Sequence, residues 1–365
     1  MKRLLCIMSN MNAGGAETFL MKVYRNIDRT KYQFDFCINV KEKCFYEDEI
    51  ISLGGKIFRI SSKTENIKEF KQQLADVIKS NKYEYVLRIT SNAMGFWDLK
   101  IAKKAGAKVC CARSSNSSDG AGIKSKVAHM LGRLLYRKYV DVAFAPSDLA
   151  ASYTFGKKSY KNGNVHILNN AVDLDIFYYD EDARSKVRKE FGIGSDVNVF
   201  GHIGRFMEQK NHMFLANIFK MVKEKDSNAI LFLVGDGELK EQFEEKAIQL
   251  GIRDSIVFTG IRSDIPALLS AMDVFVFPSL YEGMPNTVIE AQATGLPCVI
   301  SDTITREANI ADLVEYLPLT ASAEHWAQIA IQKLSPERSD TKQAFVENKY
   351  DIQSLTKEFE KIIFD

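Results

Sequence analysis

The chain of 365 residues has no run of about 18 consecutive apolar residues, so we expect no membrane-spanning helix. The apolar stretch near its start, Leu4–Met8, is too short for a signal-peptide core and is not followed by a small-residue cleavage site. The formal net charge is only +2, which disfavours a general polyanion binder. Together these absences predict a cytoplasmic protein that does not bind nucleic acid.

The six cysteines show no CxxC spacing of the kind found in metal sites, and most of them lie in apolar, strand-like stretches. Reduced thiols in the core of a cytosolic protein explain this pattern best. No other motif indicates ligands for a divalent ion. We therefore expect neither a metal nor a resident cofactor.

Short apolar runs alternate with amphipathic helical patterns from end to end, which is typical of βαβ units and predicts parallel sheets covered on both faces. The first series of predicted strands is Leu4–Met8, Phe34–Asn39, Lys56–Ile60, Tyr83–Ile89, Lys108–Ala112 and Val142–Ala145. The second series is Asn198–Ile203, Ala229–Val234, Ile256–Thr259, Val274–Phe277 and Cys298–Ser301. Two such series indicate an α/β fold with two doubly wound domains.

The two series are separated by a polar turn near Asn169, which precedes a charged helical stretch, Asp180–Phe191. We expect an N-terminal domain over residues 1–170, a C-terminal domain over 171–348 and a terminal segment over 349–365. The terminal segment has the periodicity of a helix, with Ile352, Leu355 and Phe359 on one face.

Two glutamates eight residues apart, Glu282 and Glu290, follow a predicted strand of the second series. Pro285 suits the first turn of a helix, and Gly295 followed by Pro297 ends it. Glu282 then lies in a strand-to-helix loop and Glu290 within the helix. The helix amides can bind phosphate while the two carboxylates bind sugar hydroxyls, so this segment suits a ligand that carries both.

A second candidate loop carries Arg205 and Lys210 directly after the predicted strand Asn198–Ile203. Ligands of doubly wound sheets bind at such strand ends. Arg can hold phosphate oxygens through two hydrogen bonds, and Lys acts as a point charge. Two cations at this position would stabilise negative charge that develops on a bound phosphate group.

The stretch from Phe277 to Glu290, continued by Gly295-Leu296-Pro297, resembles the donor-site signature of retaining GT-B glycosyltransferases of family 4. The resemblance covers nearly the whole chain and extends to members that build capsular or other extracellular polysaccharides. It implies two Rossmann-like domains facing a cleft, with the terminal helix crossing back to the first domain. It also implies metal-independent sugar transfer, with retention, from a nucleotide-diphosphate sugar, expected to be a UDP-sugar, to a glycan or lipid-linked glycan acceptor.

The resemblance assigns catalytic roles to Arg205, Lys210 and Glu282. The residues that it assigns to donor binding are Gly14, Gly15, Gly204, Gly235, Arg262, Gly283, Met284, Pro285, Asn286 and Glu290. In related sequences a His-Ser-His-Asn run stands where this chain has Arg113-Ser114-Ser115-Asn116. Either Arg113, with Asn116, takes over a polar contact to the sugar or acceptor, or activity is altered.

Two other functions fit the same resemblance. Nucleotide-sugar epimerases share the architecture and need no acceptor, so product analysis with the donor alone distinguishes them. A catalytically weakened paralogue would bind the donor without releasing nucleotide when acceptor is supplied. The replaced histidines near Arg113 motivate this second alternative.

The stretch from Asp98 to Lys138 carries ten Lys or Arg residues against two acids, Asp98 and Asp119. Within it, Ile123–Tyr139 reads as one amphipathic helix. We expect its apolar stripe to face the core and its basic face to be solvated. The alternative is a surface for anionic lipid headgroups, which would place the protein peripherally on the inner face of the cell membrane.

Overall fold

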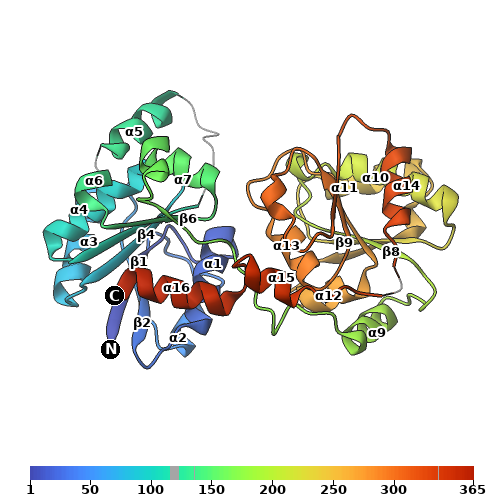
Figure 1. Cartoon of the computed structure of the whole chain (residues 1–365). Coiled ribbons are helices and arrows are strands. Elements are labelled where there is room, and N and C mark those ends of the chain that lie inside the picture. The colour runs from blue at the N-terminus through green and yellow to red at the C-terminus, as the bar shows by residue number, and fades with distance from the viewer. Residues whose placement is uncertain (116–122, 135, 336) are drawn as a thin grey trace. The chain divides into compact units, whose positions relative to one another are not determined.

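The computed structural model describes residues 1–115, 123–134, 136–335 and 337–365. It divides into two compact units, Met1–Ala171 with Ile352–Asp365, and Val172–Asp351 (Figure 1). Every pairing between named strands within the described residues is parallel, and each sheet is covered by helices. The predicted α/β class with two doubly wound domains is therefore confirmed. Within these same ranges, no helix combines the length and apolar character needed to span a bilayer.

The first unit contains a sheet with strand order β3-β2-β1-β4-β5-β6-β7. Its strands are β1 (Lys2–Ile7), β2 (Tyr32–Ile38), β3 (Ile57–Arg59), β4 (Tyr85–Thr90), β5 (Val109–Ser114), β6 (Val142–Ala145) and β7 (His166–Ile167). Leu4 of β1 lies opposite both Phe34 and Tyr85, so the winding of the chain reverses between β1 and β4. Loops that follow these two strands consequently leave the sheet toward opposite faces.

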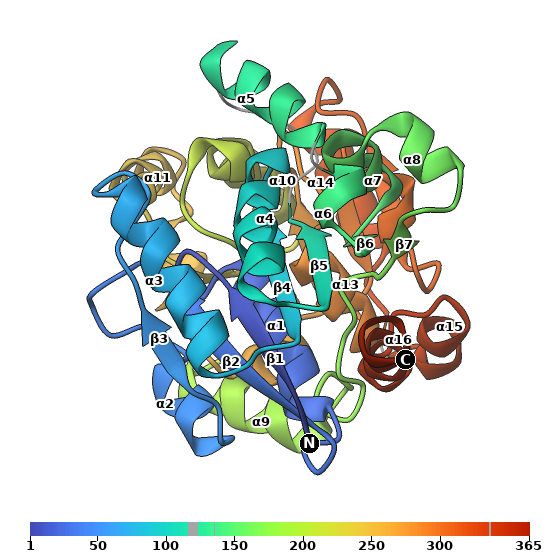
Figure 2. The same ribbon diagram turned by 90° about the vertical axis from the view of Figure 1, so that its left-hand side faces the viewer.

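Helices cover both faces of this sheet. They are α1 (Gly15–Asn26), α2 (Glu47–Ser52), α3 (Ile67–Ser80), η1 (Ala93–Gly95), α4 (Phe96–Ala105), α5 (Ile123–Arg133), α6 (Tyr136–Tyr139), α7 (Asp148–Phe155), α8 (Lys157–Lys161) and α16 (Ile352–Phe364). Figure 2 shows α3 and α4 lying across the strands on one face. On the other face α16 packs against α1, and its buried Phe359 contacts the rings of Phe34 and Phe144.

The second unit repeats the architecture with strand order β10-β9-β8-β11-β12-β13. Its strands are β8 (Val199–Ile203), β9 (Ile230–Val234), β10 (Ile256–Gly260), β11 (Val274–Phe277), β12 (Cys298–Ser301) and β13 (Val314–Leu317). Its helices are α9 (Glu181–Glu190), η2 (Glu208–Lys210), α10 (His212–Lys225), α11 (Lys240–Gln249), η3 (Arg253–Ser255), α12 (Ile265–Ala271), α13 (Asn286–Ala293), η4 (Arg306–Ala308), α14 (Ala323–Gln332) and α15 (Lys342–Glu347). The winding reverses between β8 and β11, which are adjacent in the sheet.

The fold differs from the sequence-based expectation at the edge strand β13. This strand is not predicted, because Glu315 and Tyr316 interrupt its apolar pattern and stay partly exposed. The six cysteines are all buried free thiols, as expected.

The prediction of one core-facing helix over Ile123–Tyr139 is wrong. Helix α5 ends at Arg133, and α6 is a separate turn of helix. The side of α5 that packs on the unit carries Gly132, where an added Cβ would lie 2.3 Å from the carbonyl oxygen of Ala93. That close approach turns Met130 and Leu131 outward, where they are exposed.

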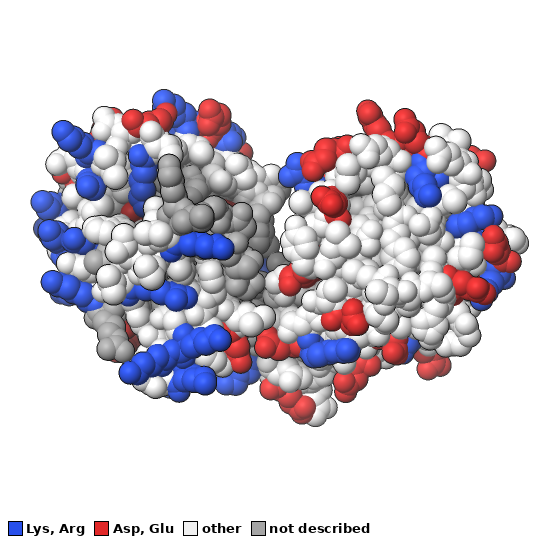
Figure 3. Space-filling view, turned by 90° about the horizontal axis from the view of Figure 1, so that it is seen from above, with Lys and Arg blue, Asp and Glu red and all other residues white. Residues whose placement is uncertain are grey.

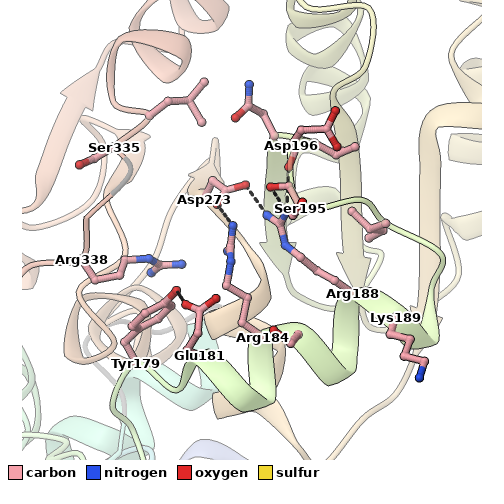
Figure 4. Close-up of a pocket in the computed structure, with 15 residues that line it drawn as sticks. Tyr179, Glu181, Arg184, Arg188, Lys189, Ser195, Asp196, Asp273, Ser335 and Arg338 are labelled. Atoms are coloured by element: carbon pink, nitrogen blue, oxygen red, sulfur yellow. Dashed lines mark hydrogen bonds and ion pairs between the residues drawn. The ribbon is translucent and has the colours of Figure 1, made fainter.

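An arginine cluster ties together the edge of the second sheet at which its central strands begin (Figure 4). Asp273, just before β11, accepts hydrogen bonds from Arg184 at 2.7 Å, from Arg188 at 2.6 Å and from the backbone N–H of Val199 at 2.7 Å. Both arginines also donate to the carbonyl of Ala271, at the end of α12. One carboxylate thus joins α9, the end of α12 and two central strands.

We expect Asp273→Ala to destabilise the second unit by about 3 to 5 kcal/mol, because Arg188, whose side chain is 5% exposed, would keep a buried charge without its partner. Urea unfolding followed by circular dichroism measures the loss. The matched control is Glu224→Ala, which removes an exposed pair with Lys220 and should cost about 0.5 kcal/mol or less. Equal unfolding midpoints for the two variants would contradict this role of Asp273.

Candidate functional site

A pocket of about 760 Å³ lies at the edge of the second sheet where the strands end. Residues from the loops after β8, β9 and β10 line it: Gly204, Arg205, Gly235, Asp236, Gly237, Ile261 and Arg262, with Ile203, Val234 and Ile265 beneath. The carboxyl edge of parallel strands is where doubly wound sheets bind ligands. The predicted residues Gly204, Arg205, Gly235 and Arg262 therefore share one pocket.

A second pocket, of about 890 Å³, lies at the opposite edge of the same sheet, where the arginine cluster stands. It does not have the character of a substrate site. Arg188 donates to the carbonyls of Gly194 and Val197, and Arg338 donates to that of Leu269. Burial lowers the pKa of Arg338 to about 10. These guanidinium groups are engaged by backbone carbonyls, so their function is structural.

Lys210 and Glu282 form an ion pair of 2.7 Å beside the carboxyl-edge pocket. Lys210 follows β8 and Glu282 follows β11, so they come together where the winding of the sheet reverses. Their side chains are only 17% and 10% exposed. The Lys210 ammonium also lies 4.6 Å from the centre of the Phe277 ring, and its stem would lie 3.3 Å from a Cβ on Gly204. The cation is therefore held in place next to Gly204, a residue of the pocket wall.

Hydrogen bonds lock the two loops that carry this pair. The N–H of Leu280 donates to the carbonyl of Gln209 at 2.8 Å, and the Gln209 amide donates to the carbonyl of Tyr281 at 2.9 Å. The Asn211 amide donates to the carbonyl of Pro278 at 3.1 Å. Gln209 and Asn211 were not predicted as site residues, although they directly flank Lys210 in the sequence. Their contribution is to fix the position of the cation and the carboxylate.

Arg205 lies in the same loop but in a different environment. Its side chain is 68% exposed, and its guanidinium is 3.3 Å from the carboxylate of Glu238, which is 62% exposed. An exposed pair of this kind contributes little to stability, about 1 kcal/mol at most. Arg205 can therefore turn toward an anion in the pocket at small cost.

The backbone of the pocket makes close approaches that only glycine allows. Gly235 has a φ of +137°, and a Cβ there would lie 2.2 Å from the carbonyl oxygen of Gly204. A Cβ on Gly237, whose φ is +158°, would lie 2.5 Å from the carbonyl oxygen of Phe206. Glycine at these positions lets the loops after β8 and β9 pack against each other and leaves the pocket open.

Helix α13 begins at Asn286, directly after Pro285, and contains Glu290. Gly283 and Met284 lie in the loop between β11 and this helix. Glu282 and Glu290 are both partly buried. The second sheet's loop thus presents the positive end of a helix with one carboxylate before it and one within it.

Arg262 lines the pocket but is bound by two acids. Its guanidinium pairs with Asp264 and with Glu190, each at 2.7 Å. These partners fix the side chain at the pocket wall.

In the first unit, Gly14 and Gly15 stand at the start of α1, after β1. A Cβ on Gly14 would lie 2.5 Å from the carboxylate of Glu17. Burial raises the pKa of Glu17 above its ordinary value. Because they follow the end of β1, the two glycines lie at the carboxyl edge of the first sheet.

Arg113, near the end of β5, is 1% exposed. Its guanidinium carbon lies 3.5 Å from the centre of the Phe19 ring, and it donates to the side-chain oxygen of Asn170 at 2.8 Å. Burial lowers its pKa to about 9. The second predicted contact, Asn116, lies outside the described residues.

His202 and His212, left out of the predicted catalytic set, are core residues of the second unit. They are 0% and 2% exposed, and their rings meet edge to face at 4.7 Å. Burial places the pKa of His202 well below its ordinary value, and it lowers that of His212 to about 4. Both rings are therefore uncharged at neutral pH. Among the described residues, no three His, Cys, Asp or Glu side chains gather so that they could hold a metal ion.

The chain is similar in sequence to known proteins. The family model described as "Glycosyl transferases group 1" matches residues 197–334. The Bacillus subtilis (strain 168) protein named "Putative glycosyltransferase EpsF" is 36% identical over 360 residues, which span 96% of this chain and 94% of that protein. The Escherichia coli UDP-Gal:alpha-D-GlcNAc-diphosphoundecaprenol alpha-1,3-galactosyltransferase is 36% identical over 141 residues, 38% of this chain and 36% of that one.

Solved structures show the same fold at low sequence identity. The Anabaena protein Alr3699/HepE in complex with UDP and glucose has a TM-score of 0.75 and 16% identity, with 99% of each chain covered. A glycosyltransferase from Rickettsia africae ESF-5 has a TM-score of 0.79 and 16% identity, over 100% of this chain and 99% of that one. Since the likeness to the Bacillus protein extends over nearly the whole of both sequences, this chain belongs to the group 1 glycosyltransferases and is a glycosyltransferase of the GT-B fold.

Proposed function

We propose that this enzyme transfers a sugar from a nucleoside-diphosphate sugar, with a UDP-sugar as the expected donor, to a glycan or lipid-linked glycan. The observation that carries the proposal is the Lys210–Glu282 ion pair beside the carboxyl-edge pocket. It puts a fixed cation and a fixed carboxylate within reach of one ligand. A sugar diphosphate needs both, a cation for its phosphates and an acceptor for its sugar hydroxyls.

In this proposal Arg205 and Lys210 hold the diphosphate. Negative charge grows on the leaving phosphate as the glycosidic bond breaks, so fixed cations stabilise the transition state more than the ground state. Lys210 is held in place by Glu282 and Phe277, whereas the exposed Arg205 closes onto the phosphates when donor binds. No metal is required for this neutralisation in the mechanism that we propose.

Glu282 then accepts hydrogen bonds from the transferred sugar, and Glu290 from the ribose. The loop from Gly283 to Asn286 brings backbone amides to the same ligand, at the positive end of α13. The glycines of the adjoining loops let the nucleotide approach the backbone closely. Gly14 and Gly15, from the first unit, belong to the donor-binding residues in this proposal. Arg113, which is 1% exposed and held by Asn170 and the Phe19 ring, has no direct contact with the ligand in it.

Several finer features of the proposed reaction depend on similarity to known proteins. We propose retention at the anomeric carbon and membership of family 4, following the resemblance of the segment from Phe277 to Glu290. The UDP that is bound by the Anabaena protein supports a UDP-sugar as donor. The diphosphoundecaprenol acceptor named for the Escherichia coli relative supports a lipid-linked acceptor. Surface polysaccharide synthesis, which the resemblance implies, is the process that we propose for the enzyme.

Replacing either member of the Lys210–Glu282 pair should abolish most activity. We expect Lys210→Ala and Glu282→Gln each to lower turnover about 10²- to 10³-fold, because each removes charge or hydrogen bonding at the reacting end of the donor. The measurement is release of nucleoside diphosphate from a panel of UDP-sugars, with an acceptor mixture of undecaprenyl-diphosphate glycans.

The matched control for these two variants is Lys220→Ala. It removes a lysine of α10 that pairs with Glu224, and the two side chains are 36% and 52% exposed. It should keep turnover within about twofold of the unmodified enzyme, since exposed charges away from the site change little. Near-normal turnover in folded Lys210→Ala would remove this residue from the mechanism. Sugar conversion without any acceptor would instead favour an epimerase.

Glu290 should act on donor binding more than on chemistry. We expect Glu290→Ala to weaken UDP binding by about tenfold or more, because a charged hydrogen-bond partner of the ribose contributes about 1.5 to 3 kcal/mol. Titration calorimetry with UDP measures this directly. Glu245→Ala, on the exposed side of α11, is the control and should bind UDP normally. Unchanged UDP affinity in Glu290→Ala would contradict the ribose assignment.

A further inference from the structure

Six large apolar side chains are exposed in one region of the first unit. They come from η1, the first turn of α4, and α5 with the residue that follows it, which are neighbouring elements. We call them the α5 patch: Met94, Trp97, Val127, Met130, Leu131 and Leu134. Their exposed fractions run from 41% for Met94 to 77% for Leu134. Contiguous apolar surface of this kind usually marks a contact with a partner.

The inner side of α5 explains why these side chains point outward. His129 is 6% exposed, accepts a hydrogen bond from the N–H of Ala93 at 3.0 Å, and stacks on Tyr153 with ring centres 4.6 Å apart. Gly132 packs directly against the Ala93 backbone. Arg133 of the same helix also donates to the carbonyls of Ser152 and Tyr153. A histidine, a glycine and an arginine therefore hold the inner side of the helix, while Met130 and Leu131 stay exposed.

Lysines surround this apolar surface. The Lys100 ammonium lies 4.8 Å from the centre of the Trp97 ring and 5.8 Å from that of Tyr139, and the Lys138 ammonium lies 5.6 Å from the Tyr139 ring. Lys126, on α5, is exposed. Viewed from the side of α5, the left-hand unit in Figure 3 shows basic side chains spread over uncharged surface.

Acidic side chains do not offset this charge. In the described part of the segment 94–139, the single acid is Asp98, which is 1% exposed and pairs with Lys63 and Arg88. The α5 patch therefore offers apolar side chains with a cationic border and no exposed carboxylate from the described residues of its own segment.

We propose that the α5 patch docks this enzyme on the surface of an anionic lipid bilayer. Met130, Leu131 and Leu134 would enter the boundary between headgroups and acyl chains, Trp97 would lie at headgroup level, and the lysines would contact lipid phosphates. Charge complementarity favours this occupant. A second copy of the chain fits less well, because a symmetric contact would set the same lysines against each other.

Docking through the α5 patch would affect which acceptors the enzyme can reach, and this consequence depends on the proposed function. Strands β4 and β5 end at the edge of the sheet from which η1 and α5 follow, and the Gly14–Gly15 loop lies at the same edge. Docking would bring this edge to acceptors anchored in the membrane. The docking itself does not depend on which reaction the enzyme performs.

The test is co-sedimentation of the full chain with two kinds of vesicle, phosphatidylcholine alone and phosphatidylcholine mixed equally with phosphatidylglycerol. We expect binding to the anionic vesicles that weakens as salt rises. Met130→Ser with Leu134→Ser should weaken it more than about tenfold, since both lost side chains enter the bilayer boundary. Lys100→Gln and Lys138→Gln should each weaken it about fivefold.

The matched control is Ile248→Ser on α11, an isoleucine that is 62% exposed in the second unit, and it should bind vesicles normally. Unchanged thermal unfolding would confirm that the patch variants are folded. Absence of binding to anionic vesicles, or unchanged binding by the Met130/Leu134 variant, would overturn the proposal. So would a dimer in sedimentation velocity that this variant abolishes, because a second copy would then cover the patch.

Sugar transfer measured on the same preparations separates this proposal from the proposed function. An enzyme that binds anionic vesicles but transfers no sugar contradicts only the function. An enzyme that transfers sugar to a soluble acceptor but ignores the vesicles contradicts only the docking.

Discussion

The order of the strands in the second sheet is the constraint on which the site depends. Strands β8 and β11 are neighbours in the sheet although they end 74 positions apart in the sequence, at Ile203 and Phe277. The loops after them therefore leave the same edge of the sheet but turn toward opposite faces. That geometry brings the loops of Lys210 and Glu282 together, and the two side chains meet at 2.7 Å. Backbone and side-chain hydrogen bonds from Gln209 and Asn211 then fix both loops. The charged pair is therefore arranged before any ligand arrives.

The groups around the pocket differ in how freely they can move. Lys210 and Glu282 are mostly buried and mutually neutralised, whereas Arg205 is exposed and only loosely paired with Glu238. In the mechanism that we propose, the fixed pair holds the reacting end of the ligand, and the exposed Arg205 closes over it. At the opposite edge of the same sheet the arginines are saturated by carbonyls and Asp273. In the mechanism that we propose, similar residue types thus bind a ligand at one edge of the sheet and stabilise the fold at the other.

Local sequence patterns predicted the architecture well, because the buried strands of parallel sheets are short, continuous apolar runs that can be recognised in the sequence. Edge strand β13 lacked such a run and was not predicted. The approach of Lys210 to Glu282 could be expected only from strand order, which local patterns do not contain. The outward face of α5 was predicted wrongly, because hydrophobic periodicity identifies an apolar stripe but not which side packs; His129 and Gly132 decided that.

We propose that a sugar nucleotide binds in the carboxyl-edge pocket of the second unit, with its diphosphate between Arg205 and Lys210. A crystal structure of the enzyme with bound UDP or UDP-sugar would locate the nucleotide. We expect phosphate oxygens within hydrogen-bonding distance of both cations, and the ribose hydroxyls within hydrogen-bonding distance of Glu290. Nucleotide bound elsewhere, with Lys210 and Glu282 still paired and untouched, would contradict it.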